Sequence, residues 1–290
     1  MSLKSYLKRG IRYVLHGTPN VLVNATISYL APNELLKGRV ALITGGTSGI
    51  GFEIAKAFIR AGASVIITGR NNDKIKNACT LIEKEMGRSE SIYGLELDNT
   101  RVDTFKDAFE KALSVKGKID ILVNNAGILG CSFGSGTGAE FSAVIDTNLK
   151  GVFFLSQLVA HYMKDNKIKG NILNIASSSS LRPAASAYTL SKWGIRGLTL
   201  GMARMLTPHG IVVNGLAPGP TATPMLMPNG VKDNIALESN LTGRFALPGE
   251  IANMAVILVS DMSRMIVGDI VYMTGGAGNI TNEDMNYDFE

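Results

Sequence analysis

The sequence predicts an α/β fold, a doubly wound parallel sheet of seven strands with helices on both faces. Apolar, strand-like segments recur along the chain, near residues 40–44, 64–68, 91–96, 119–123, 171–177, 210–215 and 269–273. Helical segments separate them, beginning after Gly51, near Asp73 and near Thr100, across 140–164, from Ala187 to Leu206 and from Pro248 to Ser260. Strands that alternate with helices form a parallel sheet that is covered on both sides.

The length and composition of the chain fit one large domain. With 290 residues, of which 46% are hydrophobic and 18% charged, the chain can bury an extensive core. We assign residues 37–290 to this domain and residues 1–36 to a basic amphipathic helix followed by a connector. In that front segment, apolar side chains recur at helical spacing from Leu3 to Leu15, and lysines and arginines lie away from them.

Charge and cysteine content narrow the function classes. The formal net charge is +5, and no basic run interleaved with aromatic residues indicates nucleic-acid binding. Cys79 and Cys131 provide neither a crosslinked framework nor a ligand cluster, and the three histidines are scattered, so we expect no metal site. Together with the lack of any apolar segment long enough to span a bilayer, these features predict a cytoplasmic protein.

A glycine-rich turn between the first strand and the first helix is typical of a nucleotide-binding loop. Residues 44–51 read TGGTSGIG. Glycines allow a tight turn and let backbone amides approach a pyrophosphate, which the positive end of the following helix dipole attracts. A glycine-rich turn without a ligand is the alternative. The cofactor contacts predicted in this loop are Gly45, Thr47, Ser48, Gly49, Ile50 and Gly51.

A tyrosine and a lysine four residues apart suggest acid/base chemistry. Tyr188 and Lys192 share one face of the helix predicted from Ala187. A positive charge within a few ångströms of a phenol favours the phenolate and lowers the pKa toward the neutral range. Tyr188 is therefore a candidate proton donor to a carbonyl oxygen. Taken alone, the pair also fits a packed ring beside a solvated charge.

Two further segments join these motifs. Asn124-Asn125-Ala126-Gly127 directly follows the fourth predicted strand, and Ser177 ends the fifth, a short way upstream of Tyr188. In this order the motifs resemble the short-chain dehydrogenase/reductase family, in its one-domain form similar to the 3-oxoacyl-carrier-protein reductases. The resemblance runs from about Lys37 to about Gly276 and implies a Rossmann-type fold.

By this resemblance, Tyr188 is the general acid/base, and Lys192 both tunes it and bonds the nicotinamide ribose. Ser177 hydrogen-bonds the substrate oxygen, and Asn148 anchors a proton-relay water. Relatives commonly place the serine thirteen residues before the tyrosine, whereas Ser177 lies eleven before Tyr188. We choose Ser177 because it holds the position that the strand fixes, with Ser178 as the fallback.

The resemblance also assigns the cofactor. Gly69 stands where relatives that prefer NAD place an acidic residue, and Arg70 follows, so NADP(H) is favoured over NAD(H). Ser48 argues for the alternative, because NADP-preferring relatives often carry a basic residue there. The other predicted contacts are Asp98 at the adenine, Asn125, Ala126 and Gly127 after the fourth strand, and Pro218, Gly219, Thr221 and Thr223 around the nicotinamide.

The predicted reaction is reversible hydride transfer between NADP(H) and a small-molecule carbonyl or secondary alcohol, without a metal. The resemblance implies 3-oxoacyl thioesters, small ketones, sugars or polycyclic alcohols as substrates. Residues 224–247 are expected to form a mobile substrate lid, with Met225, Leu226 and Met227 as an apolar lining. The alternative is a dinucleotide-binding regulatory or scaffold protein without turnover.

The two ends of the chain leave alternatives open. We favour a homotetramer or homodimer, in which the basic helix of residues 1–16 packs on its own subunit or on a neighbour. Contact of this helix with an anionic membrane surface is the alternative. The tail carries Glu283, Asp284, Asp288 and Glu290 without a basic residue among them, so the two ends are also candidates to meet across an oligomer interface.

Overall fold

The structure is a computed structural model that describes residues 34–227, 235–237 and 240–277, all within the unit Ala31–Glu290. Our predictions for the basic helix of residues 1–16 and for the acidic tail lie outside these residues. In the part of the chain that is described, no helix is long and apolar enough to cross a membrane. In that same part, no group of three or more His, Cys, Asp and Glu side chains is arranged to hold a metal ion.

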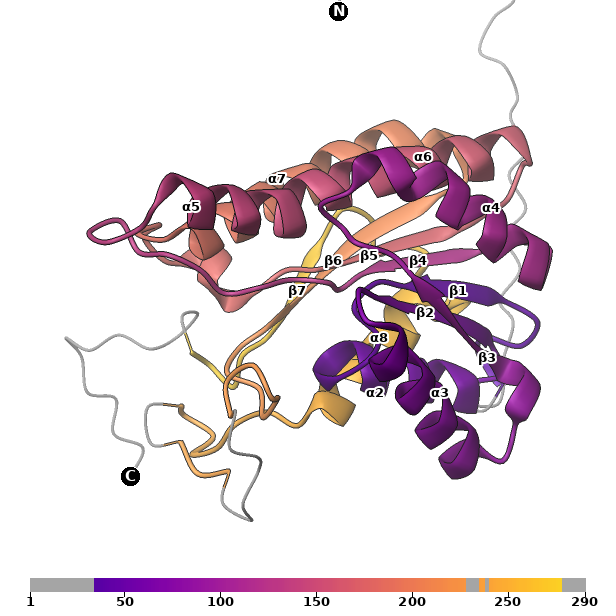
Figure 1. Ribbon diagram of the computed structural model, residues 1–290, viewed down its shortest axis with the longest axis horizontal. Helices are drawn as coiled ribbons and strands as arrows, with labels where there is room; N and C mark the ends of the chain where they lie inside the picture. Colours follow the sequence, from indigo (N-terminus) through magenta and orange to yellow (C-terminus); the bar gives the residue numbers. More distant parts are fainter. Residues whose placement is uncertain (1–33, 228–234, 238–239, 278–290) are drawn as a thin grey trace, which may run out of the picture. The chain divides into compact units, whose positions relative to one another are not determined.

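Seven parallel strands form one sheet in the order β3-β2-β1-β4-β5-β6-β7, which confirms the predicted sheet (Figure 1). The strands are β1 (Val40–Ile43), β2 (Ser64–Gly69), β3 (Ile92–Glu96), β4 (Ile121–Asn124), β5 (Asn171–Ile175), β6 (Val212–Pro218) and β7 (Ile270–Met273). Most bounds lie within one or two residues of those predicted. The exception is β6, which runs three residues further than expected, to Pro218.

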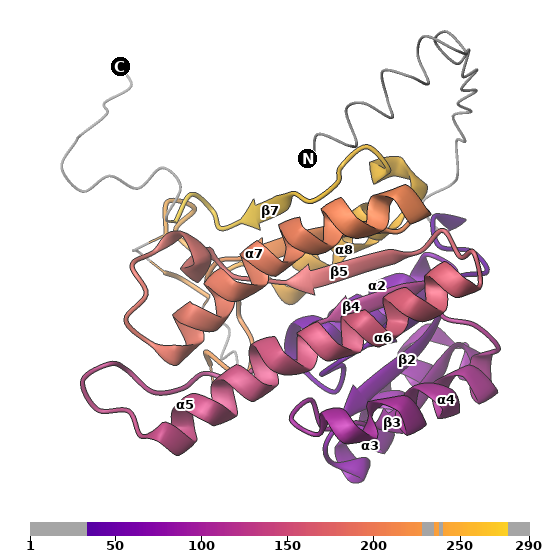
Figure 2. The same ribbon diagram turned by 90° about the horizontal axis from the view of Figure 1, so that it is seen from above.

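Helices cover both faces of the sheet, as predicted (Figures 1 and 2). One face carries α2 (Gly49–Arg60), α3 (Asn72–Met86) and α8 (Pro248–Val259). The other carries α4 (Phe105–Lys116), α5 (Gly138–Ile145), α6 (Gly151–Asp165) and α7 (Ala187–Leu206). The single helix predicted across residues 140–164 is in fact two helices joined by a π-helical turn, Asp146–Lys150.

Alternate side chains of β1 pack against the helices on opposite faces of the sheet. Ala41 and Ile43 belong to the apolar cluster that contains Ile54, Phe58 and Ile251 of α2 and α8. Val40 and Leu42 point the other way, into the cluster built from α4, α6 and α7. Because both faces of the strand are buried, it reads as an uninterrupted apolar run rather than as an alternating one.

The strand order places a topological switch at β1. The chain adds β2 and β3 on one side of β1, then crosses to add β4 to β7 on the other, so β1 pairs in parallel with both β2 and β4. In such sheets the connections at the carboxyl ends of the two central strands diverge and leave a crevice. Because the sheet is parallel, the connections after β1, β4, β5 and β6 all leave it at the same carboxyl edge, where this crevice lies.

Candidate active site

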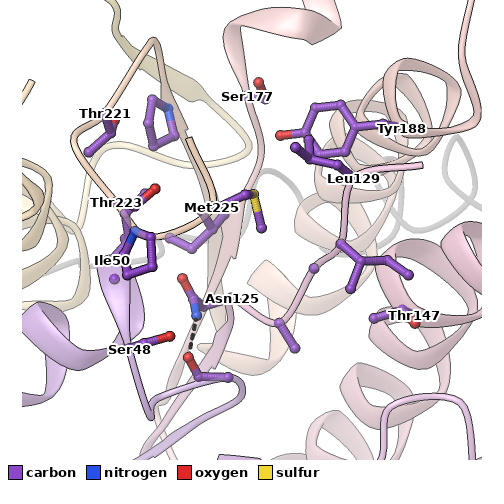
Figure 3. A pocket seen from close by; sticks show the side chains of 18 of the residues that line it. Ser48, Ile50, Asn125, Leu129, Thr147, Ser177, Tyr188, Thr221, Thr223 and Met225 are labelled. Atoms are coloured by element: carbon purple, nitrogen blue, oxygen red, sulfur yellow. Dashed lines mark hydrogen bonds between the residues drawn. The ribbon is translucent and has the colours of Figure 1, made fainter. Parts of the chain in front are cut away.

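A cleft of about 910 Å³ lies at this carboxyl edge and collects nearly all of the predicted site residues (Figure 3). Those that line it are Gly45, Thr47, Ser48, Gly49, Ile50, Arg70, Asp98, Asn125, Ala126, Gly127, Ser177, Tyr188, Lys192, Pro218, Gly219, Thr221 and Thr223. Gly51 and Asn148 do not line the cleft; Gly51 lets the glycine loop and Asn125 come close together, and Asn148 hydrogen-bonds the backbone of Ile128.

The glycine loop is shaped by close approaches of backbone. Gly45 and Gly49 have φ of +65° and +59°, the left-handed region that favours glycine. A Cβ on Gly51 would lie 2.4 Å from Asn125 Nδ2 and 2.5 Å from Gly45 O, so this position has no room for a side chain. Ser48 precedes α2 and makes no side-chain capping bond, which leaves the first amides of the helix uncapped by that side chain.

The two asparagines after β4 have different tasks. Asn124 is buried and donates to Ser156 Oγ and Asn174 Oδ1, each at 2.8 Å, which ties β4 to α6 and β5. Asn125 turns toward the glycine loop and donates from Nδ2 to Thr44 O and Gly45 O, each at 3.0 Å. The second asparagine therefore fixes the loop against β4, as its place in the cleft requires.

Two cations stand at the end of β2, of which the sequence analysis identified one. Arg70 and Lys74 both line the cleft, and neither side-chain cation makes a hydrogen bond or ion pair within the described residues. Lys74 is brought there by the helix cap, because Asn71 Oδ1 accepts from Lys74 N at 2.9 Å at the start of α3. Asp98 lies in the same lining, with Oδ1 accepting from the backbone N–H and the hydroxyl of Thr100.

Ser177 and Tyr188 lie beside each other in the cleft (Figure 3). Ser177 Oγ accepts from Ser179 N at 3.1 Å, which leaves its proton free to donate. Burial raises the pKa of Tyr188 above its ordinary value, and a hydrogen bond with Ser177 partly offsets this rise. Ser178, the fallback, also lines the cleft.

Lys192 is buried close to the tyrosine, although it still reaches the cleft lining. Its ammonium donates to Ile175 O at 2.8 Å and lies 5.5 Å from the centroid of the Tyr188 ring. Burial lowers the pKa of Lys192 to about 8, because a charged group loses hydration in the protein interior. The net shift of the Tyr188 pKa is upward, because burial outweighs the hydrogen bond with Ser177; Lys192 is not among the causes of this shift, so its effect on the tyrosine stays a prediction.

Asn148 sits in the π-helical turn and organises backbone from below the cleft. Its Oδ1 accepts from Ile128 N at 2.8 Å, and its Nδ2 donates to Ile128 O at 2.9 Å and to Ser191 Oγ at 3.2 Å. Ser191 Oγ in turn donates to Tyr188 O at 2.6 Å. The asparagine thus connects the segment after β4 to the helix that carries the tyrosine.

The segment after β6 closes the cleft from another side. A Cβ on Gly219 would lie 2.8 Å from Thr274 Cα, so the backbone runs close against the end of β7. Met225 and Leu226 line the cleft, as predicted, and Met227 does not. Five further lining residues were not predicted from the sequence, namely Asn99, Ile128, Leu129, Thr147 and Arg182.

The lining fits a dinucleotide. The glycine loop would lose its shape on addition of side chains, and Asn99 presents a buried Nδ2 without a partner where it lines the cleft near Asp98. Unpaired buried donors are rare in proteins, and a heterocycle with acceptor nitrogens would satisfy this one. A pyrophosphate would complement the uncapped amides at the start of α2.

Comparisons with known proteins agree with this geometry. A family model described as short chain dehydrogenase matches residues 39–234. A 3alpha-hydroxysteroid dehydrogenase of Mediterraneibacter gnavus is 35% identical over 254 residues, 84% of this chain and 98% of that protein. A 3-oxoacyl-(acyl-carrier-protein) reductase of Thermotoga maritima is 35% identical over 246 residues, 83% of this chain and 98% of that protein.

A solved structure gives the same match in three dimensions. A 3-ketoacyl-(acyl-carrier-protein) reductase from Brucella melitensis, complexed with NADH, has a TM-score of 0.75 and 32% identity. The match covers 84% of this chain and 99% of that one.

Fold and cleft together define a dehydrogenase or reductase that acts on CH–OH or carbonyl groups with NAD(P). The chain belongs to the short-chain dehydrogenase/reductase family. The resemblance inferred from the sequence motifs is thereby confirmed, including the similarity to 3-oxoacyl-carrier-protein reductases.

Proposed function

We propose that this chain is an NADP(H)-dependent oxidoreductase that interconverts a carbonyl and a secondary alcohol, with Tyr188 as general acid/base. The observation that carries the proposal is the convergence of Ser177, Tyr188 and Lys192 with the glycine loop on one cleft. When bound, the nicotinamide supplies the hydride in reduction and accepts it in oxidation. The pyrophosphate would lie on the loop of residues 45–51.

The chain's own residues then handle the oxygen and its proton. A raised pKa keeps Tyr188 protonated near neutral pH, which is the form that donates a proton to a carbonyl oxygen during reduction. The Ser177 hydroxyl donates a hydrogen bond to the same oxygen as negative charge develops on it. With a pKa of about 8, Lys192 retains its proton at neutral pH and places a positive charge near the Tyr188 ring.

The preference for NADP(H) rests on the cations after β2. Arg70 and Lys74 are both available to bind a ribose 2′-phosphate, and no carboxylate stands at the end of β2, where Gly69 lies. Lys74 strengthens the prediction made from Arg70, because it supplies the second basic group that Ser48 does not. Arg70 and Lys74 together favour a phosphate over a free hydroxyl.

Replacement of Tyr188 by Phe tests the proposal. NADPH and NADH consumption is measured over a panel of ketones, and NADPH affinity is measured by fluorescence titration. We expect the wild type to prefer NADPH, and Tyr188→Phe to lower kcat roughly 10³-fold with NADPH affinity changed less than about twofold. The control is Tyr162→Phe, which removes a hydroxyl group outside the cleft lining. The ring of Tyr162 packs on that of Phe109, with 5.2 Å between the ring centroids, so this variant should leave both measurements unchanged.

The outcomes separate the candidate functions. Near-normal turnover in Tyr188→Phe contradicts the role of the phenol. NADPH binding by the wild type without turnover on any ketone favours the regulatory or scaffold alternative. If the wild type consumes NADH as fast as NADPH, the proposed preference for NADP(H) is contradicted, and the proposed role of Tyr188 is not affected.

The proposal includes a homodimer or homotetramer located in the cytoplasm. Exposed apolar side chains on α6 and α7, among them Phe153, Phe154, Trp193 and Leu200, support contact with a second copy. Sedimentation equilibrium tests the assembly, and a monomer at micromolar concentration would contradict it.

A further inference from the structure

The cleft contains one more cation, Arg182, beyond Arg70, Lys74 and Lys192, and the proposed chemistry does not use it. Arg182 lies between Ser177 and Tyr188 in the chain, directly after the 3₁₀ turn Ser178–Leu181, and it lines the cleft. Within the described residues its guanidinium makes no hydrogen bond or ion pair. An exposed arginine that borders a substrate cleft without a partner is available to a ligand.

Two arginines close to the cleft region in the fold are occupied by protein partners, unlike Arg182. Arg196 lies in α7, the helix that follows the turn. Its guanidinium donates to Ser180 O at 3.4 Å and lies 5.4 Å from the centroid of the Trp193 ring. Arg244 forms a two-bond ion pair with Glu250, at 2.7 and 2.8 Å. These guanidinium groups serve the fold, whereas that of Arg182 faces the cleft unpaired.

The backbone that presents Arg182 is held firmly. Trp193 Nε1 donates to Arg182 O at 2.9 Å, and Arg182 N donates to Ser179 O at 3.2 Å. Ser180 Oγ lies 3.1 Å from the Tyr272 hydroxyl, which ties the same turn to β7. A cation on a fixed backbone loses less conformational freedom when it binds than one on a mobile loop.

The cleft that Arg182 lines also presents exposed apolar side chains and a single carboxylate. Leu129, Met225 and Leu226 line the cleft although each side chain is 45 to 47% exposed, so their apolar surface is available to a ligand. Leu129, Met225 and Tyr188 border the space drawn in Figure 3. Among the described residues that line the cleft, Asp98 is the only one with a carboxylate, and it stands near the end of β3.

We propose that Arg182 selects substrates in which an apolar body joins the reacting carbonyl to an anionic group, a carboxylate or a phosphate. The apolar body contacts Leu129, Met225 and Leu226, and the anion pairs with the Arg182 guanidinium, whose planar fork matches carboxylate and phosphate oxygens. This inference rests on the proposed function, because the carbonyl must lie at Ser177 and Tyr188. It assigns Arg182 to recognition and not to the chemical step.

The test compares acids with their neutral esters. Medium-chain oxo carboxylic acids and their methyl esters share the carbonyl and the apolar chain and differ in charge. For the wild type we expect a higher kcat/KM on the acids. Arg182→Ala should lower kcat/KM on the acids about tenfold, mainly through KM, and leave the esters within about twofold. Arg182→Lys should keep part of the preference, and added salt should reduce it in the wild type.

A control variant separates recognition from disturbance of the turn. Arg196→Ala removes a contact to the same turn but no charge that lines the cleft, so it should affect acids and esters alike. If Arg182→Ala lowers both substrates equally, or neither, the inference is overturned while the proposed function stands. If the wild type reduces neither these compounds nor any neutral ketone, the inference about Arg182 and the proposed function are both overturned. Oxo alkyl phosphates in place of the acids show which anion is preferred.

Discussion

The two ends of the cleft are built from different parts of the polypeptide. At the glycine loop, backbone approaches backbone so closely that a Cβ on Gly51 would meet Asn125 at 2.4 Å. Around Ser177 and Tyr188, which we call the side-chain end, side chains form the wall of the cleft. The large apolar side chains that line the cleft remain nearly half exposed, namely Leu129, Met225 and Leu226. The glycine loop leaves little room for any other side chain. Exposed side chains can be replaced without disturbing the backbone, so this part of the cleft tolerates more change than the glycine loop.

The largest expected effect comes from breaking the backbone-built end. Gly51→Ala forces a Cβ against Asn125 Nδ2 and Gly45 O, and overpacking of this kind lowers the free energy of unfolding by about 2 kcal/mol or more. Thermal denaturation and NADPH titration should show a lower Tm and weakened binding. Gly249→Ala, where nothing lies within 4 Å of an added Cβ, is the matched control and should change neither. An unaltered Tm in Gly51→Ala would mean that the loop can yield.

At the side-chain end, a loss of activity rather than of stability identifies the catalytic serine. Ser177→Ala should lower kcat/KM roughly 10²-fold, because it removes the hydroxyl that is hydrogen-bonded to Tyr188. Ser178→Ala should change kcat/KM less than about threefold. Steady-state kinetics on one ketone measures both. The reverse ranking would transfer the role to Ser178.

The smallest expected effect concerns Lys74, which lines the cleft beside Arg70. Lys74→Ala should raise the KM for NADPH about fivefold and leave that for NADH unchanged, since an exposed cation contributes modestly to phosphate binding. Lys76→Ala, on the same helix but outside the cleft lining, is the control. Equal changes for the two cofactors would assign Lys74 to something other than the 2′-phosphate.

The sheet and the backbone-built end of the cleft could be predicted from the sequence because their signals are local. An apolar run, a glycine turn and an amphipathic helix each occupy adjacent residues. The π-helical turn at Asp146–Lys150 was missed, because one wider turn leaves no compositional mark. Lys74 was missed as well, although recognition of Asn71 as the N-cap would have placed it in the first turn of α3, beside Arg70.

The pKa of Tyr188 shows what the sequence does not contain. The spacing of Tyr188 and Lys192 correctly places a cation near the ring, at 5.5 Å from its centroid. Spacing does not show how deeply either group is buried, and burial determines the direction of both shifts. Arg182 was overlooked for a related reason, since only the folded turn reveals that its side chain borders the cleft.

The indole that fastens the turn has a further consequence. Trp193 is the only tryptophan in the chain, and it is 42% exposed, bonded to the Arg182 carbonyl and covered in part by the Arg196 guanidinium. Indole emission responds to hydrogen bonding and to nearby charge. The molecule therefore carries a native fluorescent probe next to the turn that presents Arg182, and its fluorescence reports movement of this turn without any label.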